Sequence, residues 1–107
     1  MSAYGVGHLH EVTMGPGIVE YLERIDATLE PFGGKFIVHG AKAEVKEGDF
    51  RGDLIVIEFP DLDRAREWYD SAAYQAIIPL RADNSVGDIF LLDGVDGDHV
   101  ATDVLAT

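Results

Sequence analysis

The chain has 107 residues, 47% of them hydrophobic and 26% charged, which is the composition of one ordinary globular domain. Twenty acidic residues against eight basic ones give a net charge of −12, which argues against nucleic acids and anionic membranes as partners. No apolar run approaches the roughly 18 residues of a membrane span, and the N-terminus lacks a signal-peptide pattern. We therefore expect a cytoplasmic protein, and the absence of cysteine excludes disulfides and thiolate ligands.

The first two elements are predicted as a strand over residues 3–12 and a helix that begins at Pro16. Gly33 and Gly34 are expected to end this helix, because glycine readily adopts the left-handed conformation of a helix C-terminus. In the strand, two glycines share one face and the other face carries Tyr4, Val6, His8, His10 and Val12. The helix has one apolar stripe at spacings of three and four, made of Ile18, Leu22, Ile25, Leu29 and Phe32.

The rest of the chain alternates strands and helices. A second strand is predicted over residues 35–45, with Phe36 and Val38 on one face and Ile37 and His39 on the other. The third strand, residues 54–59, is nearly all apolar, which favours a central position in the sheet. Asp61 caps a helix over residues 62–70, and Ser71 caps a short helix that Pro79 kinks or closes. A last strand is predicted over residues 88–94.

The element order is β-α-β-β-α-β with an extra short helix before the last strand, which predicts an α+β, ferredoxin-like fold with an antiparallel sheet. We assign residues 1–96 to this domain and residues 97–107 to a C-terminal tail. Both faces of the third strand are apolar, and the helices cover only one face of such a sheet. We therefore expect a homodimer in which the two sheets face each other.

Two histidines on the first strand, His8 and His10, are the first candidates for chemistry. Their side chains point the same way, with Cα atoms roughly 6.6 Å apart, a spacing that suits two ligands of one metal. A metal site needs a third ligand, for which His39, Glu58 or Glu11 would have to come close. We favour a polar strip in a barrel interior or interface, and we assign no metal.

A carboxylate within an apolar strand, Glu58, needs a partner, a proton or a wet cavity. Arg81 and the two histidines are candidate partners. A carboxylate beside a histidine would suit proton transfer near neutral pH. We favour the structural alternative, an ion pair or hydrogen bond that joins the helix to the sheet. The aromatic residues of the second and third helices are expected mainly in the core or an interface, with a polar tip free to orient a ligand; they are Trp68, Tyr69 and Tyr74.

Four stretches resemble a known family: AYGVGHLHEV, GGKFIVHGAKAEVKEG, LIVIEFPDLDRAREWYDSAAYQAIIPLR and DIFLLDGVDG. Together they are similar to the family of domain of unknown function 1330, over roughly residues 3–96. The resemblance implies the dimeric α+β barrel fold, which muconolactone isomerases, antibiotic-biosynthesis monooxygenases and chlorite dismutases share. Members commonly carry arginine and two glycines where this chain has His39, Gly40 and Ala41. If that arginine binds an anionic ligand in relatives, this chain must do so differently or not at all.

Two functions that use a pocket remain open at this level, beside a third possibility in which the dimer is the functional surface and the pocket is vestigial. The first is a small-molecule enzyme for proton transfer, isomerisation or cofactor-free oxygenation, with His8, His10, His39 and Glu58 as catalytic groups. Its ligand would be bound by Arg81, Tyr69, Tyr74 and Trp68, in a pocket between helices and sheet or between two sheets. The second is a non-catalytic ligand-binding or stress-related dimer with the same pocket. Turnover separates them, and no cofactor follows from the sequence.

Overall fold

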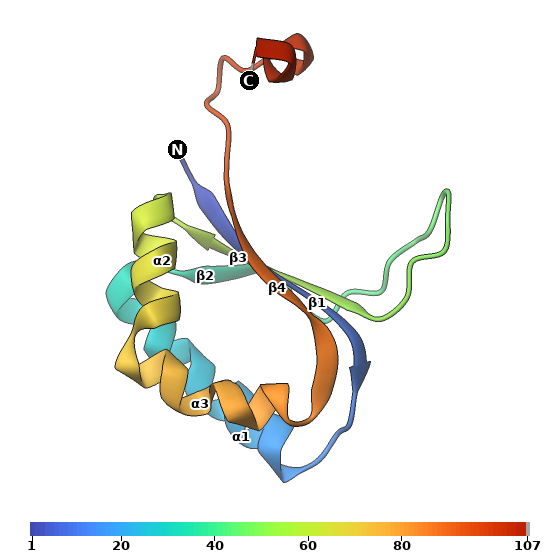
Figure 1. Ribbon diagram of the computed structural model, residues 1–107, viewed down its shortest axis with the longest axis vertical. Helices are drawn as coiled ribbons and strands as arrows, with labels where there is room; N and C mark the ends of the chain where they lie inside the picture. The colour runs from blue at the N-terminus through green and yellow to red at the C-terminus, as the bar shows by residue number, and fades with distance from the viewer. Residues whose placement is uncertain (107) are drawn as a thin grey trace.

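A computed structural model of the chain describes residues 1–106, which form one four-stranded sheet with helices on one of its faces (Figure 1). The strand order is β2-β3-β1-β4, and all neighbours are antiparallel. The predicted ferredoxin-like order and the extra helix before the last strand are confirmed. The elements are β1 (Ala3–Val12), α1 (Pro16–Leu29), a 3-10 turn (Glu30–Phe32), β2 (Lys35–Val38), β3 (Asp53–Phe59), α2 (Leu62–Asp70), α3 (Ala72–Ala82), β4 (Ser85–Asp93) and a 3-10 helix (Ala101–Ala106).

The helix ends follow local chemistry. Gly33 ends the turn after α1 with a φ of 69°, in the left-handed region that costs glycine little. Asp61 caps α2 by accepting a hydrogen bond from the Arg64 amide at 2.8 Å, and Ser71 caps α3 by accepting one from the Tyr74 amide at 3.2 Å. These caps confirm the predictions. For Pro79 the sequence predicted a kink or the end of the short helix, and the second alternative is wrong because α3 continues to Ala82.

Two bulges change which side chains share a face. The pairing of β1 with β4 skips His10, and the pairing of β2 with β3 skips Ile37. An extra residue in one strand shifts the alternation beyond it. Val12 therefore lies on the helix side of the sheet rather than beside His8, and His39 stacks on Phe36, with ring centroids 4.4 Å apart. The predicted opposite placement of these two rings is wrong, and β2 ends at residue 38 instead of 45.

The core lies between the sheet and the helices. Its fully buried large side chains are Tyr74, Phe59 and Ile77. On α1 the buried residues include Tyr21 and Thr28, whereas Leu22, expected in the stripe, is 42% exposed. The predicted stripe residues Ile18, Ile25 and Leu29 are buried, and the buried face is wider than predicted because α1 packs against α3 as well as against core residues of the sheet.

The opposite face of the sheet carries exposed apolar side chains, including Leu54, Phe90 and Leu92. We call this the outer face. Beyond β4 the chain leaves the sheet and ends in the 3-10 helix, set apart from it (Figure 1). The division into residues 1–96 and a tail stays a prediction, and the tail's last residue, 107, lies outside the described residues. No described helix is long and apolar enough to cross a membrane, and a cytoplasmic location stays a prediction.

Candidate functional site

A cavity of about 250 Å³ lies between the helices and the inner face of the sheet. That volume is slightly below the roughly 300–1,000 Å³ of pockets for drug-sized ligands, which indicates a small molecule. Its buried end is formed by Tyr21, Trp68 and Tyr74, and exposed residues, among them Met14 and His39, line its open end. Most of the lining is apolar, from strands β1, β3 and β4 and from helix α1.

Two glycines of β1 make room for this cavity. Gly5 and Gly7 lie on the inner face and line it. A Cβ at Gly7 would lie 3.2 Å from Ile89 Cδ1, and one at Gly5 would lie 3.4 Å from Phe59 Cε2. Side chains here would project into the cavity, because successive strand residues alternate between the faces. The two glycines noted in the sequence therefore determine how much of the helix–sheet space stays open.

A pair of tyrosine hydroxyls lies at the buried end. Tyr21 comes from α1 and Tyr74 from α3, and their hydroxyl oxygens are 2.8 Å apart, so one donates a hydrogen bond to the other. The proton of the accepting hydroxyl remains available to a ligand. Beneath them, Trp68 Nε1 donates to Thr28 Oγ1 at 3.0 Å, which satisfies the indole and fixes its ring. Trp68 also packs on Tyr74, with ring centroids 4.0 Å apart.

Arg81, in the last turn of α3, brings the cation of the site. Its Cζ lies 5.8 Å from the centroid of the Tyr21 ring, within cation–π range. Its Nε is buried, and no hydrogen-bond acceptor among the described residues reaches it. Buried polar atoms are normally paired, so this donor can take an acceptor from a molecule bound in the cavity that Arg81 lines. A ligand oxygen would supply that acceptor.

The protonation states follow from this environment. Burial, assisted by the adjacent Tyr74, raises the pKa of the Tyr21 hydroxyl above its ordinary value. Burial acts against the Arg81 cation, but Tyr74 and Tyr21 outweigh it, and the pKa of the guanidinium is raised. At neutral pH the site therefore holds a protonated Tyr21 and a charged Arg81. Both offer hydrogen bonds to an oxygen, and neither is a base.

The structure divides the predicted site residues between the two faces of the sheet. The cavity contains Arg81, Tyr74, Trp68 and His39. Tyr69 does not line it and packs against Tyr74 from behind, with ring centroids 5.6 Å apart. The remaining predicted residues, Glu58, His8 and His10, have their side chains on the outer face.

The expected partners of Glu58 were wrong. It forms an ion pair with Lys35, 3.3 Å away on the neighbouring strand β2, and not with Arg81 or a histidine. Sequence reasoning also missed Tyr21. Its position supplied the signal, since it lies three residues after Ile18 and four before Ile25, on the same helix face.

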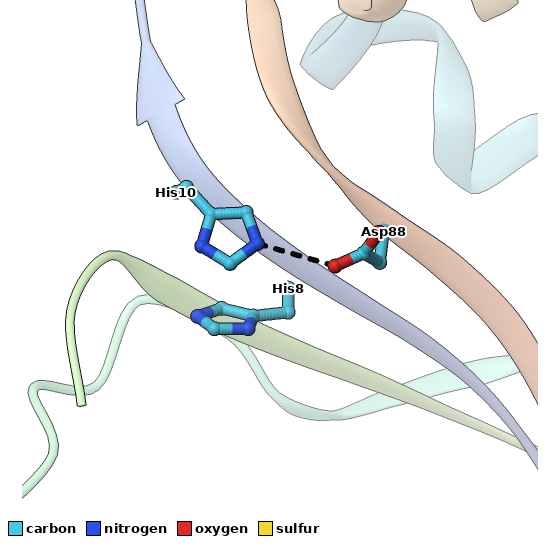
Figure 2. Close-up of side chains that lie close together, drawn as sticks. All are labelled: His8, His10 and Asp88. Atoms are coloured by element: carbon cyan, nitrogen blue, oxygen red, sulfur yellow. Dashed lines mark hydrogen bonds and ion pairs between the residues drawn. The ribbon is translucent and has the colours of Figure 1, made fainter. Parts of the chain in front are cut away.

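The outer face holds a second polar group, formed by His8, His10 and Asp88 (Figure 2). His10 Nε2 lies 3.2 Å from Asp88 Oδ2, and the two imidazole centroids are 4.1 Å apart. None of the third ligands considered from the sequence belongs to this group, which takes its carboxylate from β4. The sequence could not indicate Asp88, because strand register alone brings it beside His8.

Comparison with protein families gives one match, the domain of unknown function DUF1330, over residues 2–95. The chain belongs to this family. The resemblance found in the sequence is thereby confirmed, although the family description assigns no activity. No curated protein matches the chain.

Solved structures with the same fold include RPA0582 of Rhodopseudomonas palustris, a protein of unknown function (TM-score 0.65, 15% identity, 89% of this chain and 83% of that one). A dimeric ferredoxin-like protein of unknown function from Jannaschia sp. CCS1 has a TM-score of 0.65 at 14% identity, covering 90% and 100% of the two chains. SnoaB of Streptomyces nogalater, described as a cofactor-independent oxygenase, has a TM-score of 0.55 at 12% identity, covering 91% and 94%. At these identities the likeness shows the fold alone.

Proposed function

We propose that this DUF1330 protein binds a small, mostly apolar compound with a carbonyl or carboxylate oxygen, and that it catalyses proton transfer at the carbon next to that group. The observation that carries the proposal is the buried Nε of Arg81, without a hydrogen-bond partner among the described residues, in a mostly apolar cavity. A ligand oxygen would satisfy this donor and the free proton of the Tyr21–Tyr74 pair, while the apolar part fills the space above Gly5 and Gly7.

The same groups suit a reaction in which negative charge develops on oxygen. Removing a proton from the carbon next to a carbonyl places charge on that oxygen as an enolate. A fixed cation and a hydroxyl donor in an apolar site stabilise such an oxyanion more strongly than water does. Arg81 and the tyrosine pair would fill this role, and neither is suited to accept the proton.

His39 is the group in the cavity that we assign as the base. Its imidazole lies at the open end and is held by stacking on Phe36, with an angle of 17° between the rings. An imidazole exchanges protons near neutral pH. His39 would take the proton from carbon and return it to the same or another carbon, which gives exchange or isomerisation. SnoaB is described as a cofactor-independent oxygenase, so we also test molecular oxygen, in place of a returned proton, as a reaction partner of the enolate.

Proton exchange in D₂O tests the reaction directly. Aryl-substituted ketones and keto acids are incubated with the protein, and loss of the α-proton signal is followed by ¹H NMR, with oxygen uptake measured in parallel. We expect exchange with at least one compound that binds, and a loss of roughly 10²-fold or more in the His39→Gln variant, the usual scale for a general base. His99→Gln is the matched control, since this histidine lies in the tail and outside the cavity.

A binding function without catalysis is the second candidate, and the same experiment separates the two. Compounds that raise the melting temperature without exchange or oxygen uptake would leave only ligand binding. If no compound of this class binds, the proposal fails for both candidates.

We also propose that the protein is a homodimer that pairs its outer faces. Apolar side chains lie side by side there, because the half-buried Val6 is paired with the half-buried Val56 of β3 on one side and with the exposed Phe90 of β4 on the other. Phe90 and Leu92 are 42% and 51% exposed in the single chain, an arrangement that favours burial by a second copy. The Jannaschia structure of the same fold is described as dimeric.

Light scattering after size-exclusion chromatography tests the dimer. We expect twice the chain mass of 11.7 kDa for the natural sequence and a single chain mass for Phe90→Lys, which places a charge among the apolar side chains of this face. Val19→Lys is the matched control, since Val19 is 48% exposed on α1. A natural protein that elutes as a monomer at micromolar concentration would contradict the proposal.

A further inference from the structure

We propose that His8, His10 and Asp88 bind one divalent transition-metal ion of the Zn²⁺ type, on the outer face of the sheet. One ligand atom from each residue lies within 4.8 Å of the other two (Figure 2). In a tetrahedral zinc site the ligand atoms are about 3.3 Å apart, as follows from metal–ligand distances of about 2.0–2.1 Å. The exposed side chains of His10 and Asp88 can make this small adjustment by rotation.

The backbone brings the three residues together. His8 and Asp88 are direct cross-strand partners in the antiparallel pairing of β1 with β4. His10 follows on the same strand, at the bulge where the β1–β4 pairing skips one residue. Bulges redirect a side chain, and here His10 Nε2 points at Asp88 (Figure 2). The bulge needs the glycine beside it, because a Cβ at Gly87 would overlap the His8 backbone.

A neighbouring carbonyl group orients the first ligand. His8 Nε2 lies 2.7 Å from the carbonyl oxygen of Arg51, so this nitrogen carries the proton and donates it. The neutral ring then has its lone pair on Nδ1, the nitrogen left for a metal. Metal-binding histidines usually donate their second ring nitrogen in this way, which fixes the tautomer and the ring. Stacking on Phe50, with ring centroids 4.7 Å apart, holds the ring further.

The loop that supplies this carbonyl is fitted closely to β1. Gly52 has a φ of 92°, and a Cβ there would overlap the carbonyl oxygen of Leu9. Only glycine combines this backbone conformation with such a close approach. The loop thereby places the Arg51 carbonyl at His8, an arrangement that a random surface histidine does not have.

The donor set defines the metal class. Two neutral imidazoles and one carboxylate suit Zn²⁺ or Fe²⁺ and leave coordination positions open for water or an anionic ligand. Mg²⁺ and Ca²⁺ prefer oxygen ligands throughout, so they are poor competitors here. The site lies on the outer face, opposite the cavity, so it depends neither on the proposed reaction nor on its substrate; it shares this face with the proposed dimer contact around Val6 and Phe90.

Isothermal titration with ZnCl₂ tests the site, using protein made without an affinity tag and treated with chelator. Millimolar Mg²⁺ is present throughout to occupy the nonspecific sites that a net charge of −12 creates. We expect one Zn²⁺ per chain with a dissociation constant in the micromolar range or below. The Asp88→Asn and His10→Gln variants should each bind at least tenfold more weakly, in line with the loss of one of three ligands.

His99→Gln is the matched control, because His99 also lies beside a carboxylate, with Nδ1 3.7 Å from Asp103 Oδ2. It should bind Zn²⁺ as the natural sequence does. Equal affinity in Asp88→Asn, or displacement by Mg²⁺, would overturn the proposal, as would an equal loss in the control.

Nuclear magnetic resonance of the natural protein gives a test without mutation. Long-range ¹H–¹⁵N spectra should show the His8 ring protonated at Nε2 and unprotonated at Nδ1, and Zn²⁺ should shift Nδ1 of His8 together with Nε2 of His10. A His8 ring protonated at Nδ1, or signals unmoved by Zn²⁺, would contradict the site.

Discussion

Replacing Arg81 with methionine should have opposite effects on stability and on ligand binding. In the ligand-free protein Arg81 Nε is buried without a partner, and a buried unsatisfied donor costs roughly 1–3 kcal/mol. Because the whole side chain is only half-buried, we take the lower end of this range. Methionine retains much of the apolar stem and removes the unpaired donor. The substitution also removes the contact with the Tyr21 ring, which reduces the gain in the free energy of unfolding by about 0.5–1 kcal/mol.

The expected net change in the free energy of unfolding lies between zero and a gain of about 0.5 kcal/mol. For a chain of 107 residues with roughly 2.1 cal/mol/K of unfolding entropy per residue, 1 kcal/mol corresponds to about 4 °C in melting temperature. Binding of an aryl carboxylate should weaken, because a hydrogen bond to a charged group contributes about 1.5–3 kcal/mol, or roughly 10- to 150-fold in affinity.

Thermal melts followed by circular dichroism measure the first effect, and fluorescence titration of Trp68 with an aryl carboxylate measures the second. Arg66→Met is the matched control, since this exposed arginine of α2 makes only a surface ion pair with Asp63. A loss of several kcal/mol of stability in Arg81→Met with unchanged ligand affinity would show that the arginine is structural, and would refute the assignment of an anion-binding role.

Three further predictions follow from the same cavity. Gly7→Val should abolish ligand binding, because the new side chain fills the cavity beside Ile89. The free energy of unfolding should be kept or raised, because a β-branched residue suits a strand. A variant that binds normally would contradict this. Tyr74→Phe should lower the unfolding free energy in urea by about 1–2 kcal/mol, because the Tyr21 hydroxyl loses its partner; an unchanged midpoint would mean that this bond contributes nothing. Because the folded-state pKa of Tyr21 is raised, its contribution to stability is constant below the unfolded pKa of about 10 and declines as pH rises above it. Ultraviolet titration should therefore show at least one of the four tyrosines ionising only with unfolding, and four ordinary titrations would refute this.

Much of the fold could be predicted from local patterns. The helix starting at Pro16, the caps at Asp61 and Ser71 and the stop at Gly33 depend on neighbours in the chain, and all are found. The central position of β3 followed from its apolar content on both faces. The prediction of which side chains share a face of the sheet was wrong where bulges occur, at His10 and Ile37. A bulge depends on the register with the partner strand, so it leaves no pattern in the sequence of the bulged strand.

The candidate site was predictable only in part. Residue types alone selected Arg81, Tyr74 and Trp68, and the structure places them around one cavity with His39. The tertiary structure decided that His8, His10 and Glu58 lie on the other face, since side-chain direction in a strand depends on register.

The sequence by itself therefore determined the element order and the presence of a sheet with two apolar faces, because these depend on local propensity and periodicity. The family followed from the resemblance of four stretches of the sequence. Only the tertiary structure paired Tyr21 with Tyr74, left Arg81 Nε without an acceptor and brought Asp88 to the two histidines. Each of these arrangements joins residues far apart in the chain, and packing and strand register decide such contacts.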